Sequence, residues 1–445
     1  MRGPSPLRAS LDDNYARLTV AGAAFFFCIE FIYFMLSDTP SFYVPSLDAL
    51  GQTAIGRDFL NTWLGGRSAL ADGPAAWFDA PVYNKFIREF IGAPYVHDYF
   101  WSYPPHILLF IWPFGLLPYF PAFLLWTFIG LATFLFAAAA GGVERKHLFF
   151  VAVAPAVAIN VFIGQNGFFT AALLIGGLSN LDRRPILSGV LFGILSLKPQ
   201  LGLLLPLVLA MHGRWRTIAA AAATVITLVA TTALIYGVDI WIGYLVKVLP
   251  QQYYLQEHQS GLLFRMVPSI FYGARVMGLP LGLAWVLQAI LSTVGLAAVI
   301  WTFWRRRDPV LSTALLITAI FLISPYSLSY DMVVLGWVVA LVRQREDTEP
   351  ADHYLLMAVW ALPAAMLLNS ELRIPTAALV LSAFAARLVW RLARAEAKVE
   401  TASDHAPAID VTPDFSAAQP SFARVRSVHG LRLAGLPLPS NWSRT

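Results

Sequence analysis

Cysteine and charged residues are both scarce in this sequence of 445 residues. There is a single cysteine, Cys28, so no disulfide can form within the chain. Charged residues make up only 13% of the chain and hydrophobic residues 58%, whereas soluble domains carry about 25% charged residues. This balance excludes an ordinary soluble protein and predicts a chain that crosses a membrane several times.

Motifs for nucleotide and metal binding are also missing. The sequence contains no G-x-x-x-x-G-K-[ST], G-x-G-x-x-G, H-E-x-x-H or G-x-S-x-G pattern, and its eight histidines show no metal-ligand spacing. These absences argue against an ATP-driven pump, an enzyme with a cytosolic nucleotide-sugar domain and a membrane zinc protease. We therefore expect no cofactor and no metal site, although metal dependence stays open. The net charge of +5 comes with arginines at the ends of apolar segments, so no nucleic-acid partner is expected.

Long apolar runs are what the sequence does contain. Continuous runs of about 20 residues are typical of membrane-spanning helices and not of a β-barrel. We predict an all-α polytopic transmembrane helix bundle of about 11–13 segments within residues 18–392. Arginines in residues 1–17 predict a cytoplasmic N-terminus by the positive-inside rule. The polar residues 393–445 are predicted to form a disordered cytoplasmic tail.

Two long loops are expected on the outer side, at residues 37–103 and 237–282. The first follows the span Leu18–Leu36 and is rich in aromatic residues, so we predict that it is folded and lies against the membrane surface. Within it, residues 83–91 repeat apolar side chains at helical spacing, which predicts a short amphipathic helix.

Several apolar segments between the two loops are too short to cross a hydrocarbon core of about 30 Å as straight helices. Short, interrupted segments are tolerated where they line protein or a wet cavity. Lys198 separates two such segments, and a lysine there costs several kcal/mol unless it meets water or an anion. A lipid phosphate would supply that anion; the alternative is a lysine that extends to the interface. Residues 104–118 are our candidate for a re-entrant segment.

Polar side chains gather at the expected outer ends of the apolar segments. Asp58 lies in the first loop, where it is either a general base or one of several solvated acids. Arg265 in the second loop is a weaker candidate than Lys198 for contacting a phosphate. The other polar stretches are Phe100–His106, Gly164–Gly167 and Ser324–Asp331.

The sequence resembles glycosyltransferase family 87, whose members are polytopic enzymes of the GT-C type and include mycobacterial phosphatidylinositol mannoside mannosyltransferases. The resemblance covers roughly residues 50–345. It is carried by four stretches in order: GRDFLNTWLGGRSAL, WSYPPHILLFIWPFGLLP, GQNGFFTAALLIGGLSN followed by RRPILSGVLFGILSLKPQLGLLLPLVL, and SPYSLSYDMVVL.

The resemblance implies an acid in the first outer loop that deprotonates the acceptor hydroxyl, and Asp58 matches that position. It also implies a basic residue near a lipid phosphate, and Lys198 matches the lysine of the family's L-K-P stretch. The family often has Ser-Pro-His in the later outer turn, whereas this chain has Tyr326 there, so His106 or His258 would have to assist if a histidine is needed. The expected substrate-binding residues are Arg57, Tyr103, His106, Gln165, Asn166, Lys198, Arg265 and Tyr326.

The resemblance implies a glycosyltransferase that uses a polyprenyl-phosphate sugar. Together with the membrane segments it leads us to predict an inverting enzyme of the cytoplasmic membrane, which would move a hexose, mannose by our hypothesis, to a lipid or glycan acceptor at the outer face, among membrane lipids. Two alternatives stay open: a transporter or flippase of a lipid-linked sugar, and a non-catalytic membrane partner in envelope polysaccharide assembly. A transporter predicts internal repeats, and the two halves show no convincing self-similarity.

Overall fold

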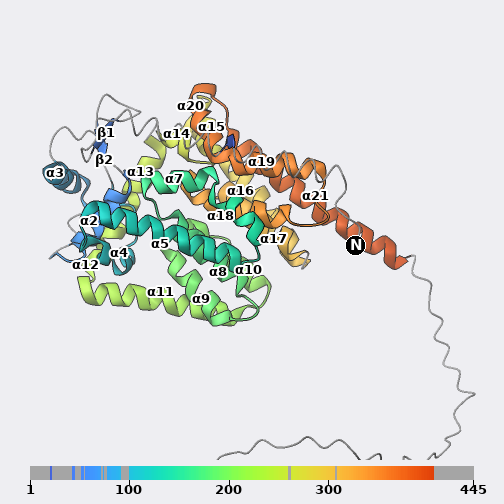
Figure 1. Cartoon of the computed structure of the whole chain (residues 1–445), viewed down its shortest axis with the longest axis horizontal. Helices are drawn as coiled ribbons and strands as arrows, with labels where there is room; N and C mark the ends of the chain where they lie inside the picture. Colours follow the sequence, from blue (N-terminus) through green and yellow to red (C-terminus); the bar gives the residue numbers. More distant parts are fainter. Residues whose placement is uncertain are drawn as a thin grey trace, which may run out of the picture. The chain divides into compact units, whose positions relative to one another are not determined.

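The computed structural model describes residues 21–22, 43–45, 52–54, 56–71, 74, 78–91, 100–258, 262–305 and 308–404. Most of the predicted first span, and residues 405–445 of the predicted tail, lie outside the described residues. The chain divides after Glu396 into two units, and the helices discussed below belong to the first, apart from the last residues of α21 (Thr376–Asp404). Within that unit the structure is an all-α bundle with one small two-stranded sheet (Figure 1).

The part of the predicted first outer loop that the structure describes is folded, as expected. It contains an antiparallel pair of three-residue strands, β1 (Tyr43–Pro45) and β2 (Gln52–Ala54), followed by helices α2 (Phe59–Ser68) and α3 (Ala80–Ile91). The predicted amphipathic helix is confirmed as α3, and its buried side chains Tyr83 and Ile87 belong to an aromatic core shared with α2. Burial of these large side chains holds the loop against the bundle.

Two glycines allow α2 to approach the next helix closely. A Cβ atom on Gly66 would lie 2.5 Å from the carbonyl oxygen of Ile111, and one on Gly115 would lie 2.3 Å from the carbonyl carbon of Gly66. Real Cβ atoms are not found at such distances, so both positions require glycine. The absence of side chains at Gly66 and Gly115 therefore allows α2 to pack directly against α4 (Leu108–Gly115).

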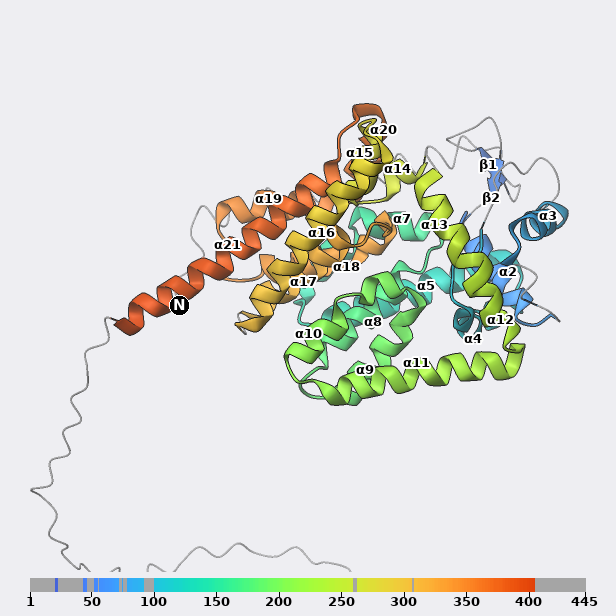
Figure 2. The ribbon, with the colours of Figure 1, turned by 180° about the vertical axis from the view of Figure 1, so that it is seen from behind.

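Apolar helices follow at short intervals through the first half of the bundle. They are η2 (Pro105–Ile107), α4, α5 (Tyr119–Ala140), α6 (Arg145–Ala152), α7 (Pro155–Ile163), α8 (Gly167–Ser179), α9 (Pro185–Ile194), η3 (Leu195–Leu197), η4 (Pro199–Gly202), α10 (Leu205–Met211) and α11 (Trp215–Tyr236). Helix α5 packs against α8, and α9 packs along α11 (Figures 1 and 2).

The second outer loop and the C-terminal helices complete the bundle. The elements are α12 (Asp239–Gly243), a π-helical turn at Tyr244–Val248, α13 (Leu249–His258), α14 (Leu262–Met266), α15 (Ile270–Val276), α16 (Leu281–Trp304), α17 (Pro309–Ile323), η6 (Ser329–Met332), α18 (Val333–Arg343), α19 (Pro350–Ala365), η7 (Met366–Leu368), α20 (Asn369–Leu372) and α21 (Thr376–Asp404). Helix α21 continues past residue 393, where the predicted tail begins.

Among the described residues, four helices are long and apolar enough to cross a membrane: α5, α11, α16 and the part of α21 up to Ala395. Helices α6 and α7, bent by 54° at their junction, would add a fifth span if counted together. Large apolar side chains on these helices are exposed; Leu234 is 87% exposed and Phe128 71%. Such a surface is suited to contact with lipid, and together with the candidate spanning helices it indicates a multi-pass membrane protein.

The remaining apolar helices are short, as the sequence predicts, and the break at Lys198 positions the site. Lys198 has φ −134° and ψ 78°, outside the helical region, between η3 and η4. Pro199 disfavours a helical conformation at the residue before it. The interruption places a charged side chain at the level of the bundle interior, where a continuous helix would present apolar residues.

Candidate active site

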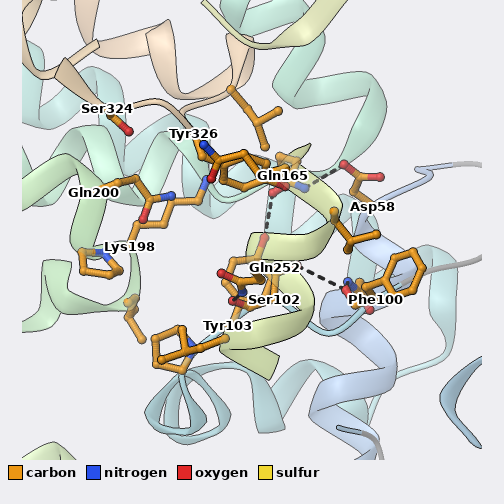
Figure 3. Close-up of a pocket in the computed structure, with 18 of the residues that line it drawn as sticks. Asp58, Phe100, Ser102, Tyr103, Gln165, Lys198, Gln200, Gln252, Ser324 and Tyr326 are labelled. Atoms are coloured by element: carbon orange, nitrogen blue, oxygen red, sulfur yellow. Dashed lines mark hydrogen bonds between the residues drawn. The ribbon is translucent and has the colours of Figure 1, made fainter. Parts of the chain in front are cut away.

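A cavity of about 640 Å³ lies where the first outer loop, the broken segment at Lys198, the turn at Gln165 and the second outer loop meet. Its size suits a substrate of several sugar-sized groups. Figure 3 shows Asp58 and Lys198 on opposite sides of the labelled residues, with Gln165 between them. The polar and aromatic residues that line the cavity are Arg57, Asp58, Asn61, Phe100, Ser102, Tyr103, Gln165, Lys198, Gln200, Tyr244, Gln252, Tyr253, Gln256, Ser324, Tyr326 and Tyr330.

The backbone before α2 is bent so that Asp58 faces this cavity. Gly56 has φ 78° and Arg57 has φ 36°, both in the left-handed region. Glycine adopts this conformation freely, but arginine does so at a cost of about 1–3 kcal/mol, and such strain gathers at functional sites. Asp58 then occupies the N-cap position of α2, yet its carboxylate makes no capping hydrogen bond to the helix.

The Asp58 carboxylate is instead held by Gln165. The Gln165 Nε2 group donates to Asp58 Oδ2 at 2.7 Å, and the Tyr103 hydroxyl donates to Gln165 Oε1 at 3.0 Å (Figure 3). Both partners are buried, so the network fixes the Gln165 amide with its N–H side toward the carboxylate. Gly164, with φ 63°, makes the tight turn before Gln165 and leaves no room for a side chain beside Phe59.

Burial raises the pKa of Asp58 above the usual range for aspartate, and the Gln165 hydrogen bond and the charges of Arg57 and Lys198 act in the opposite direction. A raised pKa brings the carboxyl group nearer to the operating range of a general base. Burial also raises the pKa of Tyr103 and raises that of Tyr326 to about 12, so both phenols are neutral hydrogen-bond donors.

Lys198 is a buried member of an ion pair. Its Nζ lies 2.6 Å from Asp331 Oδ1, and the two side chains are 5% and 0% exposed. The ammonium also lies 4.3 Å from the ring centroid of Tyr330. Burial lowers the pKa of Lys198, and the Asp331 carboxylate opposes that shift.

The structure brings six of the nine predicted site residues to one cavity: Asp58, Arg57, Tyr103, Gln165, Lys198 and Tyr326. These residues come from five separate places in the sequence, so only the folded chain brings them to a single cavity.

Three predicted residues do not line the cavity. His106 is buried, contacts the Ser196 hydroxyl at 3.1 Å through Nε2 and stacks on Trp241. Asn166 is buried at the N-cap position of α8, and Arg265 lies in α14. Each of the three lies close in the sequence to a residue that lines the cavity. Closeness in the sequence alone does not show which side chain faces the cavity.

Sequence reasoning missed the wall of the cavity that α13 provides. Gln252, Tyr253 and Gln256 line this wall, and the Gln252 side-chain amide donates to the Ser102 carbonyl. Gln200 and Asn61 add two further amides. A cluster of neutral amides and tyrosines is suited to hydrogen bonding with sugar hydroxyls. The spacing of Gln252 and Gln256 by four residues on a helix was the available signal.

Among the residues that the structure describes, no group of three His, Cys, Asp or Glu side chains is arranged to hold a metal ion. The two carboxylates near the cavity, Asp58 and Asp331, are bound to Gln165 and Lys198 respectively.

Comparison with known families decides the assignment. A family model described as Glycosyltransferase family 87 matches residues 101–325, just over half of the chain. The chain belongs to glycosyltransferase family 87. Family membership makes it a membrane glycosyltransferase, which acts on a sugar donor and an acceptor. No curated protein and no solved structure matches the chain.

The family match covers Tyr103, Gln165 and Lys198 but ends before Asp331 and begins after Asp58. The cavity nevertheless contains Asp58 beside the matched residues. The fold therefore places Asp58 of the first long loop in the same cavity as residues of the part that matches the family model.

Proposed function

We propose that this glycosyltransferase moves a hexose, with mannose as the first candidate, from a polyprenyl-phosphate donor to a hydroxyl of a lipid or glycan acceptor. The observation that carries the proposal is the placement of Asp58 and Lys198 on one cavity, each fixed by a buried partner. In this arrangement one side of the site can accept a proton and the other can bind an anion.

The reaction follows from that arrangement. The acceptor hydroxyl donates its proton to the Asp58 carboxylate while its oxygen bonds to the anomeric carbon of the donor sugar. The bond from that carbon to the phosphate oxygen breaks on the opposite face, so the configuration inverts. The lipid phosphate leaves with the bonding electron pair, and the Lys198 ammonium stabilises its negative charge, an effect that is strongest in a water-poor site.

A second cavity supports a lipid-linked donor. This cavity of about 320 Å³ lies between α9, α10 and α11, and its lining is almost entirely apolar; Phe192, Leu205 and Ala222 contribute to it. Pro199, next to Lys198, lines both cavities. A hydrocarbon chain in the second cavity would place its phosphate at Lys198.

We propose that the site faces the outside of the cytoplasmic membrane, on the side of a polyprenyl-phosphate donor. The arginines of residues 1–17 favour a cytoplasmic N-terminus, which would put the first loop on the outer side. A transporter or a non-catalytic partner would not need a base fixed by Gln165. A transporter predicts that the purified protein transfers no sugar, and a non-catalytic partner predicts that transfer needs another chain and that Asp58 can be replaced freely.

The test is sugar transfer by the purified protein with a panel of synthetic polyprenyl-phosphate sugars, read by mass spectrometry of the products. Asp58→Asn keeps the size of the side chain and removes the base, so we expect the rate to fall by about 10²- to 10⁴-fold. Asp239→Asn, at an exposed position of α12, is the matched control and should transfer at the wild-type rate. Unchanged transfer by Asp58→Asn would show that Asp58 is not the base.

A further inference from the structure

Asp331 lies directly behind Lys198 and does not line the cavity. Its Oδ1 atom is 2.6 Å from Lys198 Nζ, and its other oxygen, Oδ2, accepts a hydrogen bond from the Leu328 backbone N–H at 3.2 Å. Both carboxylate oxygens are therefore occupied, and the side chain has no exposed surface. Asp331 is held in one orientation before any substrate binds.

The turn that carries Asp331 is itself tied to the turn that carries Gln165. The Asn160 side-chain amide donates to the Tyr330 carbonyl at 2.7 Å, and the Gly167 backbone N–H donates to Asn160 Oδ1 at 3.0 Å. A Cβ atom on Gly167 would lie 2.3 Å from the Tyr330 carbonyl oxygen, so the two turns are in direct contact. One buried hydrogen-bond network therefore connects the turn of Asp331, which binds Lys198, with the turn at Gln165.

A buried lysine needs this support. Its ammonium carries three N–H donors, and one of them is engaged by Asp331. Its Nζ atom also lies over the Tyr330 ring, and the residue lines the cavity. Without a fixed partner, burial favours the neutral amine and the four-carbon chain regains its rotamer freedom.

We infer that Asp331 is a positioning residue for sugar transfer: it keeps the Lys198 ammonium charged and aimed at the site of the leaving phosphate. This inference rests on the proposed function and extends it to a residue that lies beyond the family match. Asp331 acts through Lys198 and does not touch the substrate.

The charged and titratable groups around Lys198 predict the sign of a pH effect. Asp331 and Tyr330 face it from η6, and Asp58 and Arg57 line the same cavity from the start of α2. The other tyrosines that line this cavity are Tyr103, Tyr244, Tyr253 and Tyr326. The two carboxylates favour the ammonium, the Arg57 guanidinium is a like charge that disfavours it, and the neutral phenols add no charge. Replacing Asp331 by Asn removes the nearer carboxylate, so the pKa of Lys198 falls and the amine loses its proton at lower pH.

The experiment measures kcat/KM against pH for wild type, Asp331→Asn, Asp331→Glu and the double variant Lys198→Met with Asp331→Asn. At the pH optimum of the wild type, Asp331→Asn should lose about 10²-fold, the size of effect that a misplaced group produces. Its alkaline limb should move to lower pH, so the loss grows as pH rises. Asp331→Glu keeps the charge and should recover part of the rate with the wild-type limb.

Melting temperatures of the same variants provide a readout that does not depend on turnover. Asp331→Asn leaves the buried Lys198 charge without its partner, whereas the double variant removes both charges, so the double variant should be more stable than Asp331→Asn. It should still be inactive, because the ammonium is gone. An active double variant, or a loss in Asp331→Asn that is the same at every pH, would overturn the inference and leave Asp331 a purely structural residue.

Failure of the proposed function gives a different pattern. If wild type transfers no sugar from any donor while the melting temperatures still show the coupling between Lys198 and Asp331, the ion pair stands and the assigned reaction is wrong. If wild type transfers sugar and the Asp331→Asn profile keeps the wild-type alkaline limb, the reaction stands and the positioning role is wrong.

Discussion

The hydrogen bond between Gln165 and Asp58 allows the sharpest test of the proposed role of Asp58 as the base. Gln165→Leu removes the amide that donates to the Asp58 carboxylate at 2.7 Å and keeps a buried side chain of similar size. A hydrogen bond to a charged group contributes about 1.5–3 kcal/mol. Since about 1.36 kcal/mol corresponds to a factor of ten in rate, kcat/KM should fall roughly 10- to 150-fold on the acid side of the profile.

The direction of the pH effect follows from the same bond. Asp58 acts as a base only when it is ionised, so activity is lost as pH falls through its pKa. Gln165 lowers the pKa of Asp58 against the opposing effect of burial, and its removal should raise that pKa further. The acid limb of kcat/KM should therefore move to higher pH, and the variant should regain activity as the buffer becomes more alkaline.

The assay is the initial rate of sugar transfer over a pH series, with the melting temperature of each protein measured in parallel. Gln165→Leu also leaves the buried Tyr103 hydroxyl without its Gln165 partner, which costs about 1–3 kcal/mol of stability. Tyr103→Phe is the matched control, because it removes the other hydrogen bond of Gln165 and leaves the one to Asp58. Its acid limb should move less than that of Gln165→Leu, because the amide that donates to Asp58 is still present. If Gln165→Leu kept the wild-type acid limb, ionisation of Asp58 would not control the reaction.

Two further variants, each with a control, test the apolar cavity and the contact between α2 and α4. Ala222→Phe fills the apolar cavity from an exposed position on α11 and should raise KM for long-chain donors more than for short-chain ones; Ala223→Phe, exposed on the same helix outside the cavity, should leave both values unchanged. Gly66→Ala forces a methyl group against the Ile111 carbonyl and should destabilise the protein by about 1–3 kcal/mol. Gly336→Ala, where a Cβ atom meets only ordinary contacts at 3.7 Å, should not lower the melting temperature. Equal melting temperatures for both glycine variants would refute the close contact between α2 and α4.

The membrane class and much of the local structure could be predicted from the sequence, because they depend on composition and on neighbours along the chain. Continuous apolar runs predict spanning helices whatever their packing. The spacing in residues 83–91 predicts helix α3, and Pro199 predicts the break after Lys198. The resemblance to family 87, confirmed over residues 101–325, likewise needed only the sequence and predicted a glycosyltransferase.

Partnerships between distant residues were decided only by the tertiary structure. The sequence led us to propose Lys198 as the residue that contacts a lipid phosphate. It did not predict that Asp331, 133 residues away, forms an ion pair with Lys198. It placed Asp58 and Gln165 in separate loops, 107 residues apart, and their hydrogen bond exists because Gly56, Gly164 and the aromatic core bring the two turns together. A residue's type and neighbours determine what it can do, whereas its charge partner, burial and access to the cavity depend on how all the helices pack.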